Sequence, residues 1–206
     1  MTSNQEWELG AGTARILPAS DKGIVKPLIL ASKAGPGKTD LDALQARLYT
    51  TTYSFGDALR ARGHDLILVG FDDGAAPLAD LADTVTEALR RAAAEQIGGA
   101  PLAAGGIGRG ALAVRYALTR MESRQEDHRA AGYFSFNGTA PSPEENTGLD
   151  GLGSWPRRPK KVKLVVGDHA DNLSDDDFDD NTTTAADPEG LLIPSKEGSW
   201  LLDHLA

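Results

Sequence analysis

The chain has no cysteine, no long apolar run and fewer basic than acidic residues. Without cysteine it can form no disulfide framework, no thiolate nucleophile and no cysteine-ligated metal site. No apolar run approaches the ~20 residues that a membrane-spanning helix needs. The 21 basic and 30 acidic residues give a net charge of −9, which argues against a nucleic acid or an anionic membrane as partner.

Length and composition predict one domain over residues 1–206, because 40% apolar and 25% charged residues are ordinary for a globular protein of this size. The stretch from Met1 to Gly12 is polar and acidic, unlike a signal peptide, so we expect a cytoplasmic protein. Two segments, at about 138–160 and 168–187, lack periodicity and are predicted to be solvated loops.

Short apolar runs alternate with helical patterns along the chain. Near-continuous apolar strands separated by helices are typical of a parallel sheet covered on both faces. The sequence therefore predicts an α/β fold with a mostly parallel sheet and helices on both faces. The expected strands are 15–18 (an edge strand), 26–31, 65–70, 101–104, 132–136, 161–166 and 191–194; the expected helices are 54–62, 78 to a stop at Gly98, and 112–123.

A glycine-rich turn at 105–111 lies between an expected strand and an expected helix, and it allows three interpretations. The first is a dinucleotide-binding turn, which is disfavoured because it follows a middle strand and lacks a well-placed ribose-binding acid. The second is a nucleophile elbow of the type G-x-S-x-G, flanked by Gly106 and Gly110, with Gly108 at the nucleophile position. The third is a tight turn whose glycines serve only close packing.

A second glycine-containing loop follows the strand 26–31. Gly37-Lys38-Thr39 fits the second half of a phosphate-binding loop, but Ser32 stands where its first glycine belongs and Asp40 would repel a polyphosphate. A nucleotide-binding protein is therefore favoured less. In the elbow interpretation, the same loop supplies an oxyanion-hole N–H group from Lys33 or Ala34.

From about residue 26 to residue 136, the chain resembles a family of bacterial α/β-hydrolase-like proteins found mostly in actinobacteria. The segments that carry the resemblance are 25–31, 35–36, 40–44, 58–72, 100–102, 115–118, 121–122, 127–128 and 133–136, with 155–159 similar to the family's approach to its next strand. The resemblance implies an α/β-hydrolase-like fold with a Ser-His-acid site.

The chain departs from that family at the site itself. The family's elbow reads approximately G-G-F-S-M-G-G, whereas this chain has Gly108 at the serine position and Arg109 after it. Asn137 stands where an acid is expected, and the family's long cap insertion is nearly absent, so the cap is reduced. His204 is the only histidine after the last expected strand. A triad needs all three groups, so we expect the usual hydrolytic route not to operate.

These departures favour a non-hydrolytic enzyme, such as a cyclase, isomerase or lyase of bacterial secondary metabolism; a non-catalytic binding or scaffold protein is the alternative. The candidate catalytic residues are Arg109, Asp168 and His169, and the candidate pocket and oxyanion-loop residues are Lys33, Ala34, Ile107, Gly108 and Asn137. One histidine among loop aspartates makes a poor metal site, and no metal or cofactor is expected. The expected partner is a small-molecule or peptide-like substrate, with a homodimer through the uncapped face as a further option.

Overall fold

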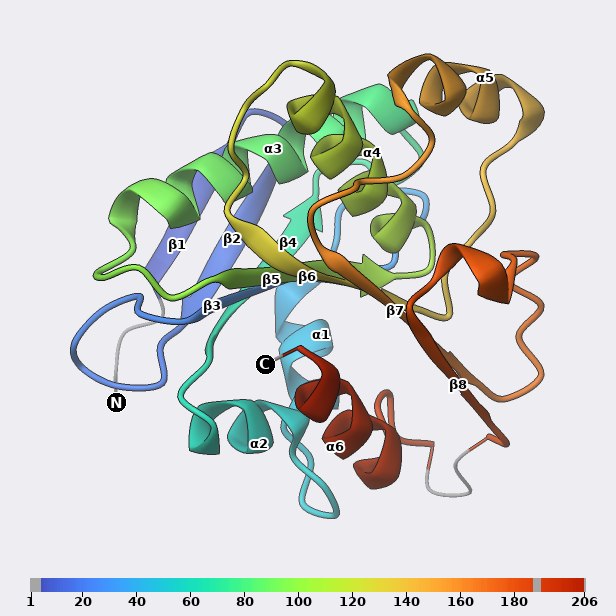
Figure 1. Cartoon of the computed structure of the whole chain (residues 1–206). Helices are drawn as coiled ribbons and strands as arrows, with labels where there is room; N and C mark the ends of the chain where they lie inside the picture. The colour runs from blue at the N-terminus through green and yellow to red at the C-terminus, as the bar shows by residue number, and fades with distance from the viewer. Residues whose placement is uncertain (1–4, 187–189, 206) are drawn as a thin grey trace.

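The computed structural model describes residues 5–186 and 190–205, and within them the chain forms one eight-stranded sheet of order β1-β2-β4-β3-β5-β6-β7-β8 (Figure 1). β1 and β2 form an antiparallel hairpin that pairs with β4, and the strands from β4 to β8 are parallel to one another. The strands are β1 Gln5–Leu9, β2 Gly12–Leu17, β3 Pro27–Ala31, β4 Asp65–Phe71, β5 Leu102–Ile107, β6 Ala130–Phe136, β7 Lys160–Val166 and β8 Asp180–Thr184.

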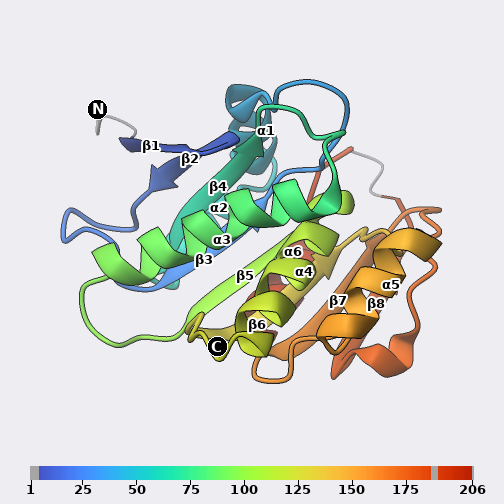
Figure 2. The ribbon, with the colours of Figure 1, turned by 90° about the horizontal axis from the view of Figure 1, so that it is seen from above.

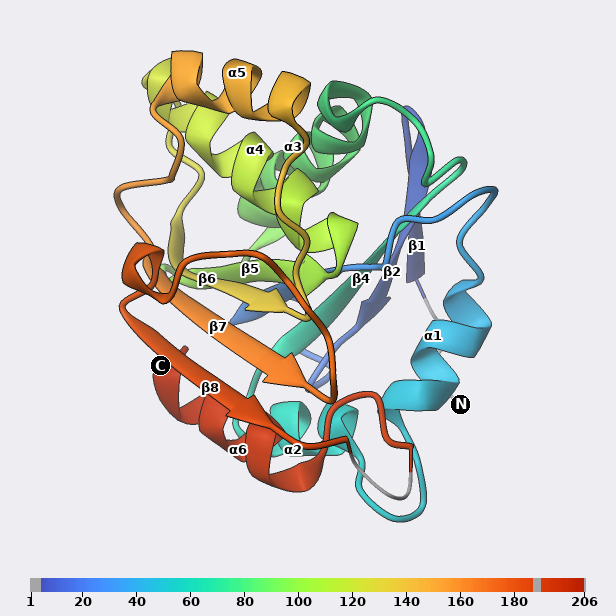
Figure 3. The same cartoon turned by 90° about the vertical axis from the view of Figure 1, so that its right-hand side faces the viewer.

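Helices cover both faces of the sheet, as predicted. The helices are α1 Leu41–Leu48, α2 Phe55–Ala61, α3 Leu78–Glu95, α4 Arg109–Ser123, α5 Pro143–Leu152 and α6 Ser195–His204, with a short 3-10 helix at Asp175–Asp177. Figure 2 shows α3, α4 and α5 side by side across one face, and Figure 3 shows α1, α2 and α6 on the other. None of the helices in the described part of the chain is long and apolar enough to cross a membrane.

The two apolar layers follow from the alternation of side chains along each strand. On β3, Ile29 packs with α3 and α4, whereas Leu28 and Leu30 pack with α1, α2 and α6. β4 divides its side chains in the same way, and both strands are fully buried. A strand that is apolar on both faces is stable only between two helical layers, which is why these two segments were recognisable from the sequence.

The predicted last strand at 191–194 is wrong. Leu192 and Ile193 are buried among the side chains of the α1, α2 and α6 layer, but they form no strand. The last strand is β8, which lies within the segment 168–187 that was predicted to be loop. Within the described part of the chain β8 pairs with β7 alone, and its polar residues alternate between half-buried and exposed. A polar edge strand of this kind has no apolar pattern, so the apolar run at 191–194 was predicted as the last strand in its place.

The strand predicted at 15–18 is present as the second half of β2, but its placement at the edge is wrong, because β1 lies outside β2. The segment 138–160, predicted to be loop, contains α5. Its start follows ordinary capping rules: Ser142 and Glu145 form a capping box, Pro143 takes the first turn, and Gly153 ends the helix in a left-handed conformation. Only Leu149 of α5 is buried, so the helix gave no apolar periodicity to detect.

Candidate functional site

The turn between β5 and α4 brings backbone segments into close contact. A β carbon on Gly110 would lie 2.1 Å from the carbonyl oxygen of Ser32, and one on Gly106 would lie 2.7 Å from the amide nitrogen of Ala111. Neither position can therefore carry a side chain. Between them Gly108 has φ 56° and ψ −128°, a conformation that L residues rarely adopt. The turn presents Gly108 at the end of β5, in front of the first turn of α4.

A cavity of about 340 Å³ opens directly on Gly108. Strand ends from β5, β6 and β7, the loop after β3, α1 and the segment after β8 all contribute to it. Its described lining residues are Lys33, Leu44, Arg47, Ile107, Gly108, Phe136, Asn137, Thr139, Val166, His169, Ala186, Gly190, Leu191 and Leu192. We call this the elbow cavity. It is apolar in its body and polar on one side, which is the usual composition of a small-molecule site.

Two backbone N–H groups lie where the loop after β3 meets the turn: that of Lys33, which lines the elbow cavity, and that of Arg109, which follows the lining residue Gly108. Ser32 donates its N–H to the carbonyl of Val69 at 2.9 Å, but the N–H groups of Lys33 and Arg109 form no hydrogen bond with another group in the described ranges 5–186 and 190–205. Arg109 is the first residue of α4, and the first N–H groups of a helix have no partner within the helix. Two such donors beside one cavity can stabilise a negatively charged oxygen.

His169 reaches the elbow cavity from the loop after β7. Its Nε2 lies 2.8 Å from the carbonyl oxygen of Gly138. Because a carbonyl oxygen only accepts, Nε2 is the donor of this hydrogen bond. Nδ1 is therefore the ring nitrogen that is left to accept a proton.

Asn137, at the end of β6, uses its side chain to join β6 to β7. Its Nδ2 donates to the carbonyl of Val166 at 3.1 Å, and its Oδ1 accepts the N–H of Val166 at 2.7 Å. This pairing continues the ladder between the two strands and requires φ 43° at Asn137. The side chain closes the cavity floor with both of its polar atoms satisfied.

The sequence-predicted residues separate into two groups. Lys33, Ile107, Gly108, Asn137 and His169 all line the elbow cavity, and Ala34, Arg109 and Asp168 do not. Ala34 is buried in the α3 and α4 layer. Asp168 is exposed on the loop after β7.

Arg109 points neither into the cavity nor freely into solvent. Its Nη1 lies 2.6 Å from Oε1 of Glu145 on α5. Burial alone would raise the pKa of Glu145, but the Ser142 N–H and the Arg109 guanidinium outweigh burial and lower that pKa. Arg109 therefore ties the start of α4 to the small helix that stands in place of a cap.

His204 is far from this arrangement in the fold. It lies in the last turn of α6, where Nδ1 is 2.7 Å from the carbonyl oxygen of Trp200 and the ring stacks on the indole. It is absent from the described lining of the elbow cavity. The histidine that lines the cavity comes from the loop after β7.

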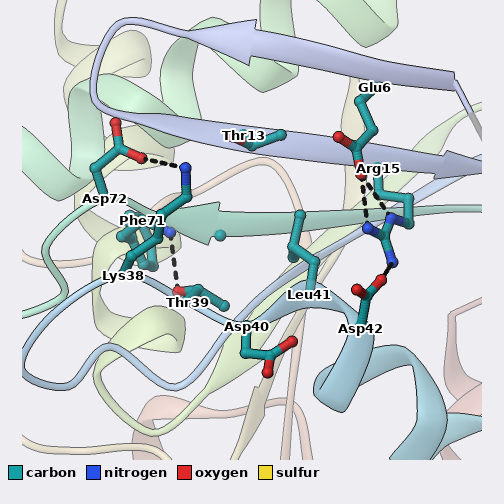
Figure 4. A pocket seen from close by; sticks show the side chains of 11 residues that line it. Glu6, Thr13, Arg15, Lys38, Thr39, Asp40, Leu41, Asp42, Phe71 and Asp72 are labelled. Atoms are coloured by element: carbon teal, nitrogen blue, oxygen red, sulfur yellow. Dashed lines mark hydrogen bonds and ion pairs between the residues drawn. The ribbon is translucent and has the colours of Figure 1, made fainter.

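A second, more polar hollow of about 240 Å³ lies between the β1–β2 hairpin and α1 (Figure 4). Its charged groups already bind one another: Arg15 pairs with Glu6 and Asp42, and Lys38 lies 3.4 Å from Asp72. Thr39 accepts the N–H of Phe71, and its hydroxyl also contacts Ser32. The lysine and threonine of the phosphate-loop-like segment are thus engaged within the fold.

Arg47 lines the elbow cavity and was missed by sequence analysis. It lies near the end of α1, a helix that was not predicted. The available signal was Asp40, whose carboxylate caps α1 by accepting the Ala43 N–H at 2.9 Å, followed by apolar residues at positions 41, 44 and 48. The helix is only eight residues long and contains the charged residues Asp42 and Arg47, so its apolar pattern was not recognised.

No protein-family model matches this sequence, and no curated protein matches it either. Solved structures do match. The esterase Est22 has a TM-score of 0.62 at 11% identity, over 98% of this chain and 78% of that one. An esterase of Pyrobaculum calidifontis has a TM-score of 0.61 at 9% identity, over 98% and 82%, and a lipase/esterase from Lactobacillus plantarum has 0.55 at 10%, over 99% of each chain. Identity this low shows the fold alone, and the chain has the α/β-hydrolase-like fold that was predicted.

These neighbours contradict the predicted function. A non-hydrolytic cyclase, isomerase or lyase was expected, with a binding, scaffold or nucleotide-binding protein as alternatives, whereas the structures to which the chain is similar are esterases and lipases. The prediction rested on Gly108 together with Arg109, Asn137, the reduced cap and the unplaced histidine. A cavity, two free N–H donors and a proton acceptor are also parts of a hydrolytic site, and none of them depends on the residue at position 108.

Proposed function

We propose that this chain hydrolyses carboxylic esters, with water instead of a serine hydroxyl attacking the acyl carbonyl. The single observation that carries the proposal is the conformation of Gly108, whose φ 56° and ψ −128° give it the strained strand-to-helix turn on which a nucleophile sits, at the edge of an apolar cavity. We further propose that the chain is a degenerate relative of the actinobacterial family, with glycine in the serine position.

The groups around Gly108 divide into three roles. The N–H groups of Lys33 and Arg109 stabilise the carbonyl oxygen as it becomes negative. Nδ1 of His169 accepts a proton from water, since Nε2 is held by Gly138. The apolar residues of the elbow cavity hold the acyl or alcohol chain.

The reaction proceeds by addition and elimination. The water oxygen forms a bond to the acyl carbon while one water proton passes to Nδ1 of His169, and the carbonyl electron pair moves onto its oxygen. That pair then re-forms the carbonyl as the bond to the alcohol oxygen breaks, and the leaving oxygen takes the proton from His169. The products are one carboxylic acid and one alcohol.

The expected rate is low. In serine hydrolases, removal of triad members leaves about 10³–10⁴-fold catalysis over water, from the oxyanion hole and binding alone. Esters with good leaving groups, such as 4-nitrophenyl esters, are therefore the substrates to test first. Binding and preorganised donors supply the acceleration, and no covalent intermediate forms.

The test is release of 4-nitrophenolate from 4-nitrophenyl butyrate by the purified chain, compared with His169→Gln and with His204→Gln as the matched control. We expect turnover without a burst, a loss of at least tenfold in His169→Gln, and a change within twofold in His204→Gln. A covalent acyl adduct seen by mass spectrometry, or equal activity of the two histidine variants, would contradict water attack assisted by His169.

Two remaining proposals concern context. We propose a cytoplasmic location, and we propose that two copies can associate through the uncapped face beside α5. The mass of the chain in solution, measured by light scattering over a range of concentrations, tests the second proposal.

A further inference from the structure

The charged side chains that line the elbow cavity are opposite in sign to the net charge of the protein. The described lining of the cavity contains two formally charged side chains, Lys33 and Arg47, and both are cationic. The chain as a whole carries 30 acidic and 21 basic residues. Among the described lining residues, two cations and no carboxylate border the elbow cavity, which reverses the overall charge locally.

Lys33 and Arg47 also line a neighbouring hollow, which lies over the loop after β3. Leu44 is the third residue that the two spaces share. Because the same three side chains border both spaces, Lys33 and Arg47 stand at the junction between the apolar body of the elbow cavity and the solvent-exposed loop.

Two acidic groups in this part of the fold already have partners; one of them, Asp40, lines the neighbouring hollow together with Lys33 and Arg47. The Asp40 carboxylate accepts the Ala43 N–H at the start of α1, at 2.9 Å. The Asp72 carboxylate pairs with Lys38 at 3.4 Å. Within residues 5–186 and 190–205, no ion pair joins Lys33 or Arg47 to a carboxylate.

Lys33 is close to the reacting position as well. A β carbon at Gly108 would lie 3.3 Å from Cγ and 3.9 Å from Cδ of Lys33. The methylene stem therefore lies along the turn, and its ammonium group extends a few bonds further. A group bound by this ammonium would be separated from a carbonyl at Gly108 by only a short chain.

We infer that the substrate carries a second, anionic group, a carboxylate or a phosphate, which Lys33 and Arg47 bind at the mouth of the elbow cavity while the ester lies at Gly108. This inference rests on the proposed function for the ester end of the substrate. Binding of the anionic group requires only Lys33 and Arg47 and no hydrolysis, so it can be tested separately. An arginine binds either oxyanion through paired N–H donors, and a lysine adds a point charge.

The first experiment measures binding without turnover. Hexanoate, hexyl phosphate and hexan-1-ol, which share one apolar chain, are titrated into the whole protein by calorimetry. We expect both anions to bind at least tenfold more tightly than the alcohol, with the affinity falling as salt is added. Equal affinity of the alcohol, or no binding of either anion at millimolar concentration, would overturn the inference. A preference for hexanoate would indicate that the substrate carries a carboxylate, and a preference for hexyl phosphate that it carries a phosphate.

The variants Lys33→Gln and Arg47→Gln are expected to weaken anion binding three- to tenfold each and to leave hexan-1-ol unchanged. Their matched controls are Lys22→Gln and Arg124→Gln, which remove exposed cations distant from the cavity lining. A loss in Arg47→Gln no larger than in Arg124→Gln would overturn the role of Arg47.

The second experiment measures turnover of a 4-nitrophenyl monoester of adipic acid against its uncharged methyl ester. We expect the anionic ester to have about a tenfold higher kcat/KM, with the difference removed in Arg47→Gln through KM. Selective anion binding without turnover of either ester would refute the proposed hydrolysis and leave the anion site standing. Equal turnover of both esters would refute the anion site and leave hydrolysis standing.

Discussion

The side chain of Lys33 lies beside Gly108, since a β carbon on this glycine would be 3.3 Å from Cγ of Lys33, so the loop after β3 packs on the turn after β5. Two segments separated by more than 70 residues in the sequence thus form one surface at the carboxyl ends of adjacent parallel strands. This is the edge of an open α/β sheet at which ligands usually bind. A side chain introduced at position 108 would therefore contact the loop after β3 as well as alter the turn after β5.

Gly108→Ser is expected to lower the free energy of unfolding by about 1–3 kcal/mol, because an L residue must adopt φ 56° there. The new β carbon also approaches Lys33 Cγ to 3.3 Å, so the lysine stem must shift. Urea denaturation measures the loss. Gly99→Ser, where a β carbon meets no atom within 4 Å and φ is not positive, is the control and should change stability little. Equal stability of the two variants would show that the turn at Gly108 is unstrained.

The ion pair between Arg109 and Glu145 is expected to hold α5 against the start of α4. Both side chains are largely buried, with 27% and 17% of their areas exposed, so the pair is screened less than a surface pair. A double-mutant cycle with Arg109→Ala and Glu145→Ala should give a coupling free energy of about 1 kcal/mol. The pair Arg91 and Glu95, which lies on the exposed face of α3, is the comparison and should give less. A zero coupling for Arg109 and Glu145 would mean that the bond is not formed in solution.

Stability should fall in acid because of His64. This side chain is buried at the junction of α2 and β4, and burial, with the nearby Lys26, lowers its pKa from 6.5 to about 4. Between these two values the unfolded chain binds a proton that the folded chain does not, so the free energy of unfolding falls as pH falls from about 6.5 to about 4.

The variant His64→Phe removes this titration and keeps a ring of similar size. Between pH 7 and pH 4.5 the wild type should lose about 2 kcal/mol more than the variant, as measured by urea denaturation at each pH. A parallel loss in both proteins would show that His64 is protonated in the folded state.

Arg115 should be a second stability determinant. It is buried on α4, its guanidinium carbon lies 3.5 Å from the centroid of the Trp155 ring, and its Nε donates to the carbonyl of Ser154 at 2.8 Å. Arg115→Met, which keeps the length and loses the charge, should cost about 2 kcal/mol and shift the emission of Trp155. Arg124→Met at the exposed end of the same helix should change neither quantity. An unchanged midpoint in Arg115→Met would refute the stabilising contact.

Strands that are covered on both faces could be predicted from the sequence. Strands and helices that bury only a few side chains could not. The strands 26–31 and 65–70 were predicted nearly to the residue, because both are mostly apolar and β3 and β4 are buried at every position. β8 was missed because Asp180 and three threonines pack against one neighbour only. α1 and α5 were missed since each buries one or two side chains, so neither has an apolar stripe.

The site could be predicted only where it depends on the backbone. The turn at Gly108 was found because glycine is required by the close approach of backbone atoms, which leaves a mark in the sequence. The partner of Arg109 was not found, since Glu145 lies in a segment predicted to be loop. Arg47 was missed because contact across the sheet edge depends on tertiary packing, which no local pattern records.

The place of the β1–β2 hairpin in the sheet also matters while the chain is being synthesised. The hairpin leaves the ribosome before β4, the strand with which it pairs in the described sheet and which begins about 50 residues later. An isolated two-stranded hairpin is marginally stable in water. Trp7 is fully buried against α3 in the finished fold. At a synthesis rate of about 5–20 residues per second, its side chain therefore stays exposed in the nascent chain for several seconds before β4 is available. Chaperone dependence of this protein should accordingly track the exposure of that tryptophan.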